Sequence, residues 1–239
     1  MGLCDFTQIS EAAQTRIRMF CAHAFNTYQS TAQTYLLTRY LLERKVPGDL
    51  VECGVAAGAQ LGAMAQAVAD LGAYDRQLHG YDSFDGIPHA GPHDDQQPGL
   101  AHFLMDRNLP LETRLTSTGI SGCPLDTVKD LWKRWNFKVK IEWHKGWFQD
   151  TLPSCTLESI AFLRLDGDLY ESTWCCLENL YSRVSPGGII FIDDWGLGGC
   201  QKAVREFWQF LKEVQQVPEP EILIDKGLKD GGDSIYWIK

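Results

Sequence analysis

Four aspartates stand at the ends of two apolar segments, where they could hold a metal ion. Asp166 and Asp168 follow the run IAFLRL, and Asp193 and Asp194 follow IIFI. If both runs are parallel strands of one sheet, their carboxyl ends meet at one crevice. Carboxylates gathered there repel one another unless a cation lies between them. Oxygen ligands suit a hard cation, Mg²⁺ first, with Mn²⁺ or Ca²⁺ as alternatives; a lone strand-end aspartate would instead be typical of a helix cap.

A second group of residues has the pattern of an adenosine site. The sequence GVAAGA begins at Gly54 directly after an apolar run, and such small residues let the backbone approach a ligand closely. The glycines at 54, 58 and 62 lack the G-x-G-x-x-G spacing of dinucleotide-binding loops. Asp82 follows the next run, 28 residues after Gly54, where an acidic side chain commonly binds ribose hydroxyls. These features favour an adenosine-type ligand without a pyrophosphate. Tight strand–helix packing and a capped turn would use the same residues.

Alternating strand and helix patterns must position these residues. The predicted strands are 49–53, 77–81, 139–143, 160–165 and 189–192, and the predicted helices are 59–71, 128–135, 172–184 and 200–214. Residues 221–224 and 234–238 predict a terminal hairpin. Residues 1–46 predict N-terminal helices, and 85–125 predict a lid-like excursion. Together these elements predict an α/β fold: a mostly parallel sheet with helices on both faces and an antiparallel edge strand.

The composition is that of a folded chain and limits its partners. The 239 residues fit a single domain spanning 1–239. Acidic residues number 31 against 22 basic ones, a net charge of −9, which disfavours nucleic acid as a partner. No apolar run reaches the ~20 residues of a membrane span, so we expect no membrane partner. The first ten residues lack a signal peptide's features, and the eight cysteines form no C-x-x-C pair, so we expect a cytoplasmic protein with reduced thiols.

Five segments give the chain a family resemblance. They occur in order across residues 49–210: VECGV (51–55), YDSFDGIP (81–88), KGWFQDTLP (145–153), LRLDGDLYEST (163–173) and SPGGIIFIDDW (185–195). They resemble the macrocin O-methyltransferase family of S-adenosylmethionine-dependent, metal-dependent methyltransferases, and more widely the catechol-type O-methyltransferases. The resemblance implies a class I methyltransferase, Rossmann-like fold with a seven-stranded sheet. The first loop departs from the family pattern, because it reads Ala-Ala-Gly-Ala-Gln at positions 56–60.

The resemblance also implies roles for particular residues. Asp82 would bind the ribose, the GWFQD loop would hold the adenine, and Gln60 would replace a hydroxyl contact to the methionine end. The full set implied for S-adenosylmethionine is Glu52, Gly54, Val55, Ala56, Gln60, Asp82, Ser83, Phe84, Trp147, Phe148, Gln149 and Asp166. The set implied for Mg²⁺ is Asp166, Asp193 and Asp194.

The reaction expected from these parts is methyl transfer to a hydroxyl of a small molecule. A vicinal diol of a sugar on a secondary metabolite, or a phenol, would suit a metal with two open positions. Catechol-type enzymes carry a lysine just after the first metal aspartate, but residues 167–170 here read GDLY. The expected proton acceptor is therefore Asp166 itself or a histidine of the excursion, His102, with His89 and His93 as alternatives.

Other functions fit parts of the sequence. Asp166-Gly167-Asp168 is a D-x-D triplet of the kind found in nucleotide-sugar glycosyltransferases, but that reading gives Asp193 and Asp194 no role. A non-catalytic module that binds S-adenosylmethionine would not need clustered carboxylates. A nicotinamide-dependent dehydrogenase lacks its glycine spacing. The sequence leaves open a homo-oligomer.

Overall fold

A six-stranded sheet forms the centre of the molecule. The computed structural model describes residues 2–23, 25, 27–94, 115–225 and 234–239. Within them the strand order is β3-β2-β1-β4-β5-β6, with β6 antiparallel to β5 and the other strands parallel. The strands are β1 (Asp49–Cys53), β2 (Gln77–Asp82), β3 (Lys140–Lys145), β4 (Ile160–Leu165), β5 (Val184–Ile192) and β6 (Ile235–Ile238). The strand order reverses between β1 and β4, where α/β sheets open a ligand crevice at their carboxyl ends.

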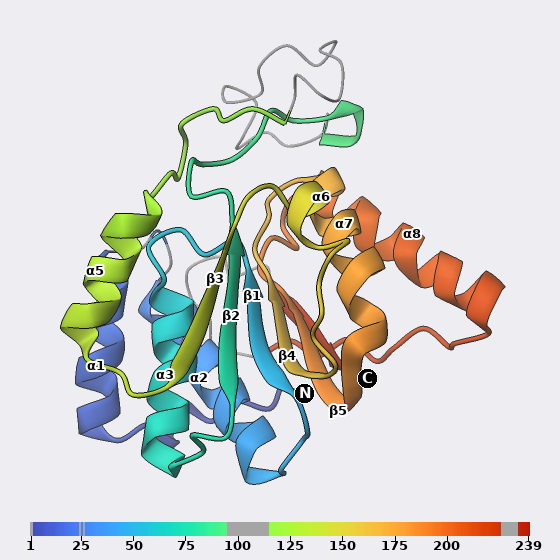
Figure 1. The fold of residues 1–239 in the computed structure, drawn as a ribbon. Helices are drawn as coiled ribbons and strands as arrows, with labels where there is room; N and C mark the ends of the chain where they lie inside the picture. The colour runs from blue at the N-terminus through green and yellow to red at the C-terminus, as the bar shows by residue number, and fades with distance from the viewer. Residues whose placement is uncertain (1, 24, 26, 95–114, 226–233) are drawn as a thin grey trace.

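Helices cover both faces of this sheet (Figure 1). One layer contains α1 (Glu11–Cys21), α2 (Tyr28–Glu43), α3 (Ala59–Leu71) and α5 (Leu125–Trp135), and the other contains α6 (Phe148–Thr151), α7 (Tyr170–Leu180) and α8 (Gly198–Gln215). Short 3₁₀ turns are η1 (Phe6–Gln8), η2 (Pro92–Asp94) and η3 (Tyr181–Arg183). The predicted α/β class with helices on both faces is thereby confirmed. No helix in the described part of the chain is both long and apolar enough to cross a membrane.

Local sequence explains why the central elements form where they do. Every residue of β4 is buried, as expected for a strand covered on both faces. Helix α8 buries Ala203, Phe207 and Leu211 along one face, which matches its helical period. Helix α3 ends at Gly72, whose positive φ of 64° suits a glycine after the last turn. The elements around the strand ends are therefore anchored by ordinary core packing.

The predicted seventh strand is reduced to a single bridge among the described residues. Leu223 and Tyr236 exchange two backbone hydrogen bonds of 2.8 and 3.1 Å, and the pairing goes no further. Pro218 and Pro220 lie just before it, and a proline has no N–H to donate to a ladder. The predicted helix 172–184 is also too long, because α7 ends at Leu180 and β5 already begins at Val184.

The predicted excursion leaves and re-enters the domain through paired segments. Ile87 N–H donates to the Ile120 carbonyl, and Thr118 N–H donates to the Ile87 carbonyl, both at 2.9 Å. Asp94 is buried and accepts hydrogen bonds from the N–H groups of Tyr170 and Gly91. These contacts fix residues 85–94 and 115–122 above the carboxyl ends of the strands (Figure 1).

Candidate active site

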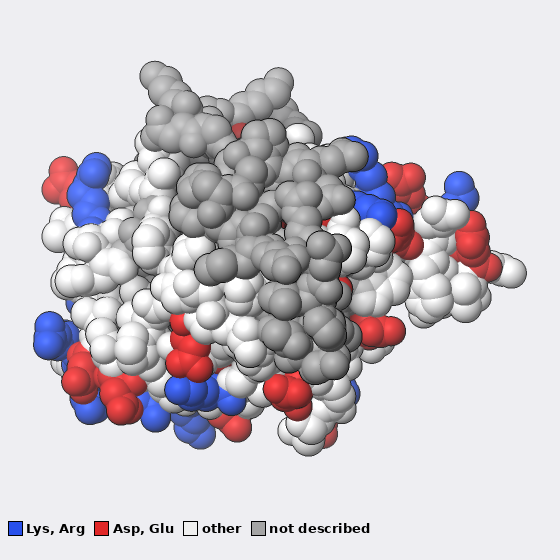
Figure 2. Space-filling view, turned by 90° about the horizontal axis from the view of Figure 1, so that it is seen from above, with Lys and Arg blue, Asp and Glu red and all other residues white. Residues whose placement is uncertain are grey.

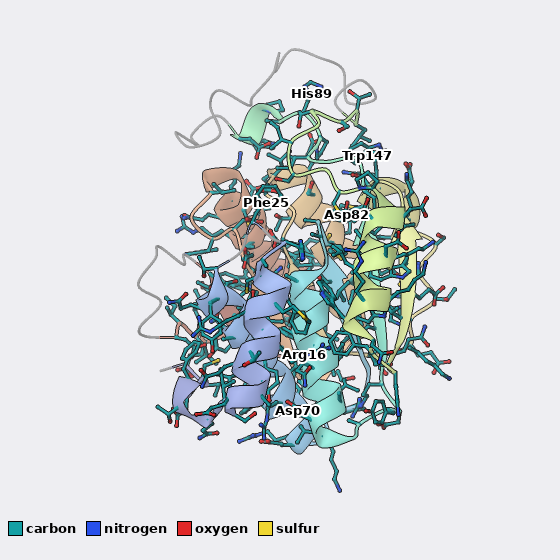
Figure 3. All side chains as sticks on the ribbon, turned by 90° about the vertical axis from the view of Figure 1, so that its left-hand side faces the viewer. Arg16, Phe25, Asp70, Asp82, His89 and Trp147 are labelled. Atoms are coloured by element: carbon teal, nitrogen blue, oxygen red, sulfur yellow. The ribbon has the colours of Figure 1, made fainter. Side chains whose placement is uncertain are left out.

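A cavity of about 250 Å³ opens at the carboxyl ends of the strands. Phe25, Asp82 and Trp147 lie toward this end of the molecule, and Asp70 lies toward the opposite end (Figure 3). Charged side chains visible from above lie mainly around the rim of this face (Figure 2). The predicted residues that line the cavity are Gly54, Val55, Ala56, Asp82, Ser83, Trp147, Phe148, Gln149, Asp166, Asp193 and Asp194.

The loop after β1 forms the cavity floor through close backbone packing. Gly54 has a φ of +93°, and a Cβ at this position would come within 1.7 Å of the Asp166 carbonyl oxygen. Only glycine therefore fits here without moving the end of β4. Asp166 N–H also donates to the Cys53 carbonyl at 2.8 Å. The loop and the first aspartate of the acidic group are thus held in one rigid unit.

Asp82 fastens this loop to the end of β2. Its Oδ2 accepts the N–H groups of Val55 at 2.6 Å and Ala56 at 3.0 Å, and its Oδ1 accepts the Phe84 N–H at 2.5 Å. Burial raises the pKa of the carboxyl, and these three N–H donors oppose that rise. Asp82 therefore shapes the cavity wall through the backbone, whatever further contact it makes to a ligand.

Three of the four aspartates converge at the ends of β4 and β5. Asp166, Asp168 and Asp194 each offer a carboxylate oxygen, and these oxygens lie within 4.8 Å of one another. Asp168 has a φ of +60°, which an aspartate tolerates, and its N–H donates to Asp194 Oδ2 at 2.8 Å. Burial, then the neighbouring carboxylates, raise the pKa of Asp168 to about 7 and that of Asp194 well above its usual range. The donor set fits a hard divalent cation.

A buried arginine holds Asp166 of this group together with two further carboxylates. Arg164 on β4 is fully buried, and its Nη1 lies 3.1 Å from Glu52 Oε1 and 2.7 Å from Asp166 Oδ2. Its Nη2 lies 2.5 Å from Asp193 Oδ1. Burial disfavours the charged guanidinium, but the carboxylates outweigh it and raise its pKa. Asp193, a predicted metal ligand, thus lies at the predicted edge but faces Arg164 instead of joining the Asp166–Asp168–Asp194 group.

Arg164 was not predicted as a site residue, although the sequence carries a signal for it. It is the one charged residue within the apolar run IAFLRL, two positions before Asp166. A buried arginine requires acidic partners. The sequence alone could have raised that question without identifying Glu52 and Asp193 as the partners.

The loop between β3 and α6 closes the other side of the cavity. Gly146 N–H donates to the Asp82 carbonyl at 2.9 Å, which ties this loop to the end of β2. Trp147 is the residue before the short α6, and Trp147, Phe148 and Gln149 all line the cavity. Two aromatic rings and an amide are suitable walls for a flat heterocycle such as adenine.

Three predicted cofactor residues are not among those lining the cavity. Glu52 is fully buried against Arg164, and burial raises its pKa well above the usual range while Arg164 opposes the rise. Gln60 is buried, with its Nε2 at 3.4 Å from the hydroxyls of Ser30 and Thr31. Phe84 packs edge-on against Trp143, at 6.2 Å between ring centroids. Each supports the cavity from behind.

Of the histidine candidates, His89 and His93 are described, and neither is among the residues that line the cavity. His93 lies against the Tyr170 ring, 4.2 Å between centroids, and its Nδ1 is 2.7 Å from Lys202 Nζ. His89 belongs to the excursion above the strand ends (Figure 3). His102 lies outside the described residues, and its predicted role stays a prediction.

Several lining residues were not predicted from the sequence. They are Phe25, Gly86, Ile87, Pro88, Ser121, Gly167 and Ser172. Phe25 is 77% exposed, unusual for a large apolar side chain, and lies beside the cavity. An isolated phenylalanine between two helices carries no sequence signal of a ligand contact. Ser121 and the Gly86–Pro88 segment lie beside Asp82 because the two arms of the excursion pair with each other.

The strand order, the crevice at the β1–β4 switch and the adjacent acidic group define a class I methyltransferase type of α/β domain. The chain matches the family described as macrocin-O-methyltransferase (TylF) over residues 32–237. This match covers most of the 239 residues. The chain belongs to the macrocin O-methyltransferase family, as the five motifs predicted.

The chain is also similar to named O-methyltransferases. The 8-demethyl-8-(2,3-dimethoxy-alpha-L-rhamnosyl)-tetracenomycin-C 4'-O-methyltransferase of Streptomyces olivaceus is 37% identical over 163 residues, 68% of this chain and 58% of that enzyme. The mycinamicin III 3''-O-methyltransferase of Micromonospora griseorubida is 36% identical over 196 residues, 80% of this chain and 68% of that enzyme. The solved structure of the O-methyltransferase NovP superposes with a TM-score of 0.71 at 30% identity, covering 91% of this chain and 82% of NovP. The matched region of the first relative is thus less than two thirds of its length.

Proposed function

We propose that this chain transfers a methyl group from S-adenosylmethionine to a sugar hydroxyl of a small molecule, with a divalent cation, Mg²⁺, at the strand ends. The observation that carries the proposal is the juxtaposition, in one cavity, of a small-residue loop and the Asp166–Asp168–Asp194 group. Membership of the O-methyltransferase family supplies the reaction class.

The cavity residues suit the two ends of the methyl donor. When bound, S-adenosylmethionine supplies an electrophilic methyl group. The β3–α6 loop offers Trp147 and Phe148 as walls for the adenine and Gln149 as a polar contact. The β1–α3 loop, held by Asp82, presents backbone at Gly54–Ala56 to the rest of the molecule. These contacts orient the donor and exclude water from one side of it.

The acidic group suits the acceptor side of the reaction. A bound Mg²⁺ would supply Lewis acidity that lowers the pKa of the acceptor hydroxyl. Asp166 and Asp194, both ligands implied by the resemblance, would hold it together with Asp168, which the sequence placed at the same strand end. Asp193 remains a predicted ligand whose carboxylate Arg164 now engages. For the proton, Asp166 and His102 remain the proposed acceptors.

The acceptor class is proposed from the relatives' names. One relative is named for a rhamnosyl-bearing acceptor and its 4'-oxygen, and another for the 3''-oxygen of mycinamicin III. We therefore place a hydroxyl of a glycosylated secondary metabolite first and a phenol second.

The proposal is tested by methyl transfer from labelled S-adenosylmethionine to glycosylated and catecholic acceptors, with and without Mg²⁺. We expect transfer that requires Mg²⁺, and a rise in melting temperature with S-adenosylhomocysteine. Asp194→Asn should lose transfer and retain S-adenosylhomocysteine binding, whereas Asp130→Asn on the exposed face of α5 should keep both. Full transfer by Asp194→Asn in the presence of a chelator would overturn the metal's role. Binding of a nucleotide sugar without any binding of S-adenosylmethionine would overturn the reaction class.

A further inference from the structure

A second group of metal-ligating side chains lies away from the cavity, on the edge of the sheet formed by β2 and β3. His79, Glu142 and His144 each offer one ligand atom, and these atoms lie within 4.8 Å of one another. The parallel register pairs His79 with Glu142 and Tyr81 with His144, so all four side chains lie on the same face of the two strands. This is the face of the Tyr81 core layer, where α6 and the 152–159 loop are the neighbouring segments.

The two imidazoles already have the spacing of neighbouring ligands in a metal site. His79 Nδ1 lies 3.2 Å from His144 Nε2, and Glu142 Oε2 lies 3.7 Å from the same His79 nitrogen. Ligands of a tetrahedral zinc ion at 2.0–2.1 Å are separated by about 3.3 Å from one another. The side chains therefore need only small rotations to surround one ion.

The surroundings orient each ring for this role. Asp49 Oδ2 lies 3.5 Å from His79 Nε2; the two atoms make no hydrogen bond in this geometry, but the nearby negative charge favours the tautomer with the proton on Nε2 and the lone pair on Nδ1. Metal-bound histidines commonly have a carboxylate in this position. His144 is stacked on Tyr81 at 4.0 Å between centroids and 7° between planes, which fixes its ring. Gln77 Nε2 donates to Glu142 Oε2 at 3.1 Å and holds that carboxylate near the pair.

The group is open to solvent on one side. His79 is 4% exposed, but it lines a depression of about 420 Å³ together with Asp49 and Glu142. The side chain of Glu142 is 56% exposed, so an ion can enter without unfolding.

We propose that His79, Glu142 and His144 form a zinc-binding site that ties the edge strand β3 to β2, with Asp49 orienting His79. Two imidazoles and one carboxylate, with a fourth position open to water, are a common ligand set for Zn²⁺ and unlike the all-oxygen group at the strand ends. For the ion to bind, His144 must change tautomer: the Nε2 proton is lost to solvent and a proton is taken up from solvent at Nδ1, so the ring stays neutral and its Nε2 lone pair is free for the ion in place of the hydrogen bond to His79. The site is independent of the proposed methyl transfer.

The test is calorimetric titration of Zn²⁺ into the chelator-treated full chain, in a buffer with excess Mg²⁺ to occupy the oxygen site. We expect one Zn²⁺ per chain and a higher melting temperature with Zn²⁺. His144→Phe keeps a flat ring against Tyr81 and should weaken binding by about 100-fold or more, and Asp49→Asn by about tenfold. His23→Asn removes an exposed histidine elsewhere and should leave binding unchanged.

Two further measurements complete the test. Co²⁺ titration should give the strong visible absorption of a four-coordinate site in the wild type and not in His144→Phe. Far-ultraviolet circular dichroism and S-adenosylhomocysteine binding show whether each variant is folded, and if His144→Phe is misfolded, Glu142→Gln at the exposed ligand replaces it. Equal Zn²⁺ affinity in the wild type and a folded ligand variant would overturn the site. Loss of Zn²⁺ binding in Asp194→Asn with retention in His144→Phe would also overturn it, because the ion would then belong to the strand-end group.

Discussion

At the carboxyl ends of the strands, two regions hold partly buried carboxylates whose hydrogen-bonding needs are met to different extents. At the end of β2, Asp82 accepts three backbone N–H groups. At the ends of β4 and β5, Asp168 and Asp194 share one such bond, from the Asp168 N–H to Asp194. The first carboxylate is satisfied by the fold, whereas the second pair gains most from a cation. Both regions have aspartates at strand ends. The number of backbone N–H donors near each aspartate therefore decides whether it holds a loop or is available to a cation.

Arg164 neutralises only part of the negative charge at the ends of β4 and β5. Its single positive charge is paired with Glu52, Asp166 and Asp193, and these three ion pairs do not include Asp168 or Asp194. One guanidinium therefore pairs with Glu52 beneath the cavity and with two of the carboxylates that line it. The negative charge of Asp168 and Asp194 would then be balanced by a bound cation. A second buried arginine at this place would remove the need for that cation.

Removing the buried positive charge of Arg164 should have the largest effect on stability. Arg164→Met leaves buried carboxylates without their partner, and we expect a loss of about 3–5 kcal/mol in unfolding free energy. Urea unfolding at pH 7 measures it. Arg39→Met, which breaks a partly exposed i,i+4 pair with Glu43, should cost less than about 1 kcal/mol. A loss in Arg164→Met no larger than in this control would contradict the account of the acidic layer.

The second largest loss of stability is expected when Asp82, the carboxylate that accepts three backbone N–H groups, is replaced. In Asp82→Asn an amide NH₂ replaces one accepting oxygen and faces N–H donors, so we expect a loss of about 1–3 kcal/mol in unfolding free energy. The β1–α3 loop is then less well held, and S-adenosylhomocysteine should bind more weakly in calorimetry. Asp130→Asn, at an exposed carboxylate of α5, serves as the control. Unchanged affinity and stability in Asp82→Asn would show that the loop does not depend on this side chain.

Removing one carboxylate from the Asp168–Asp194 pair should raise the free energy of unfolding, whereas the two substitutions above should lower it. The pKa of Asp168 is raised to about 7, so between pH 4 and 7 the native state binds its proton more tightly than the unfolded state does. Stability of the ion-free chain therefore falls as pH rises through this range. Asp168→Asn should flatten that fall and stabilise the ion-free chain at pH 8 by on the order of 1–2 kcal/mol.

Adding Mg²⁺ shows whether the effect of Asp168→Asn is due to charge repulsion or to altered packing, because only repulsion is relieved by a bound cation. We expect millimolar Mg²⁺ to stabilise the wild type at pH 8 and to stabilise Asp168→Asn less, as followed by thermal unfolding. Repeating the titration with Asp193→Asn shows which of the two aspartates contributes more to cation binding. A wild-type stability that rises between pH 4 and 7 without Mg²⁺, with no difference in Asp168→Asn, would argue against a repulsive cluster.

Sequence patterns predicted the parts of this molecule that depend on local order and on sheet topology. Strands 49–53 and 160–165 occur as predicted, and the small-residue loop and Asp82 line one cavity because parallel strands end at one edge. What could not be predicted depends on side chains from different strands. The position of Arg164 between Glu52 and Asp193 is of this kind, because it needs the β1–β4–β5 order in three dimensions. The pairing of His79 with His144 likewise follows only from the β2–β3 register.

The smallest effect is expected for a substitution of Gln60. This substitution tests whether the β1–α3 loop, which Asp82 holds, binds the cofactor through its backbone or through side chains. The sequence predicts a contact from Gln60 to the methionine end of the cofactor. In the structure its amide is buried, its Nε2 makes long bonds of 3.4 Å, and its Oε1 has no hydrogen-bond partner among the described residues. Gln60→Met keeps the volume and should change stability by less than about 1 kcal/mol. Because Gln60 does not line the cavity, S-adenosylhomocysteine affinity should also stay within a few-fold of the wild type. A tenfold loss of affinity, about 1.4 kcal/mol, in a variant of unchanged stability would show that the side chain reaches the ligand and that the backbone loop does not act alone.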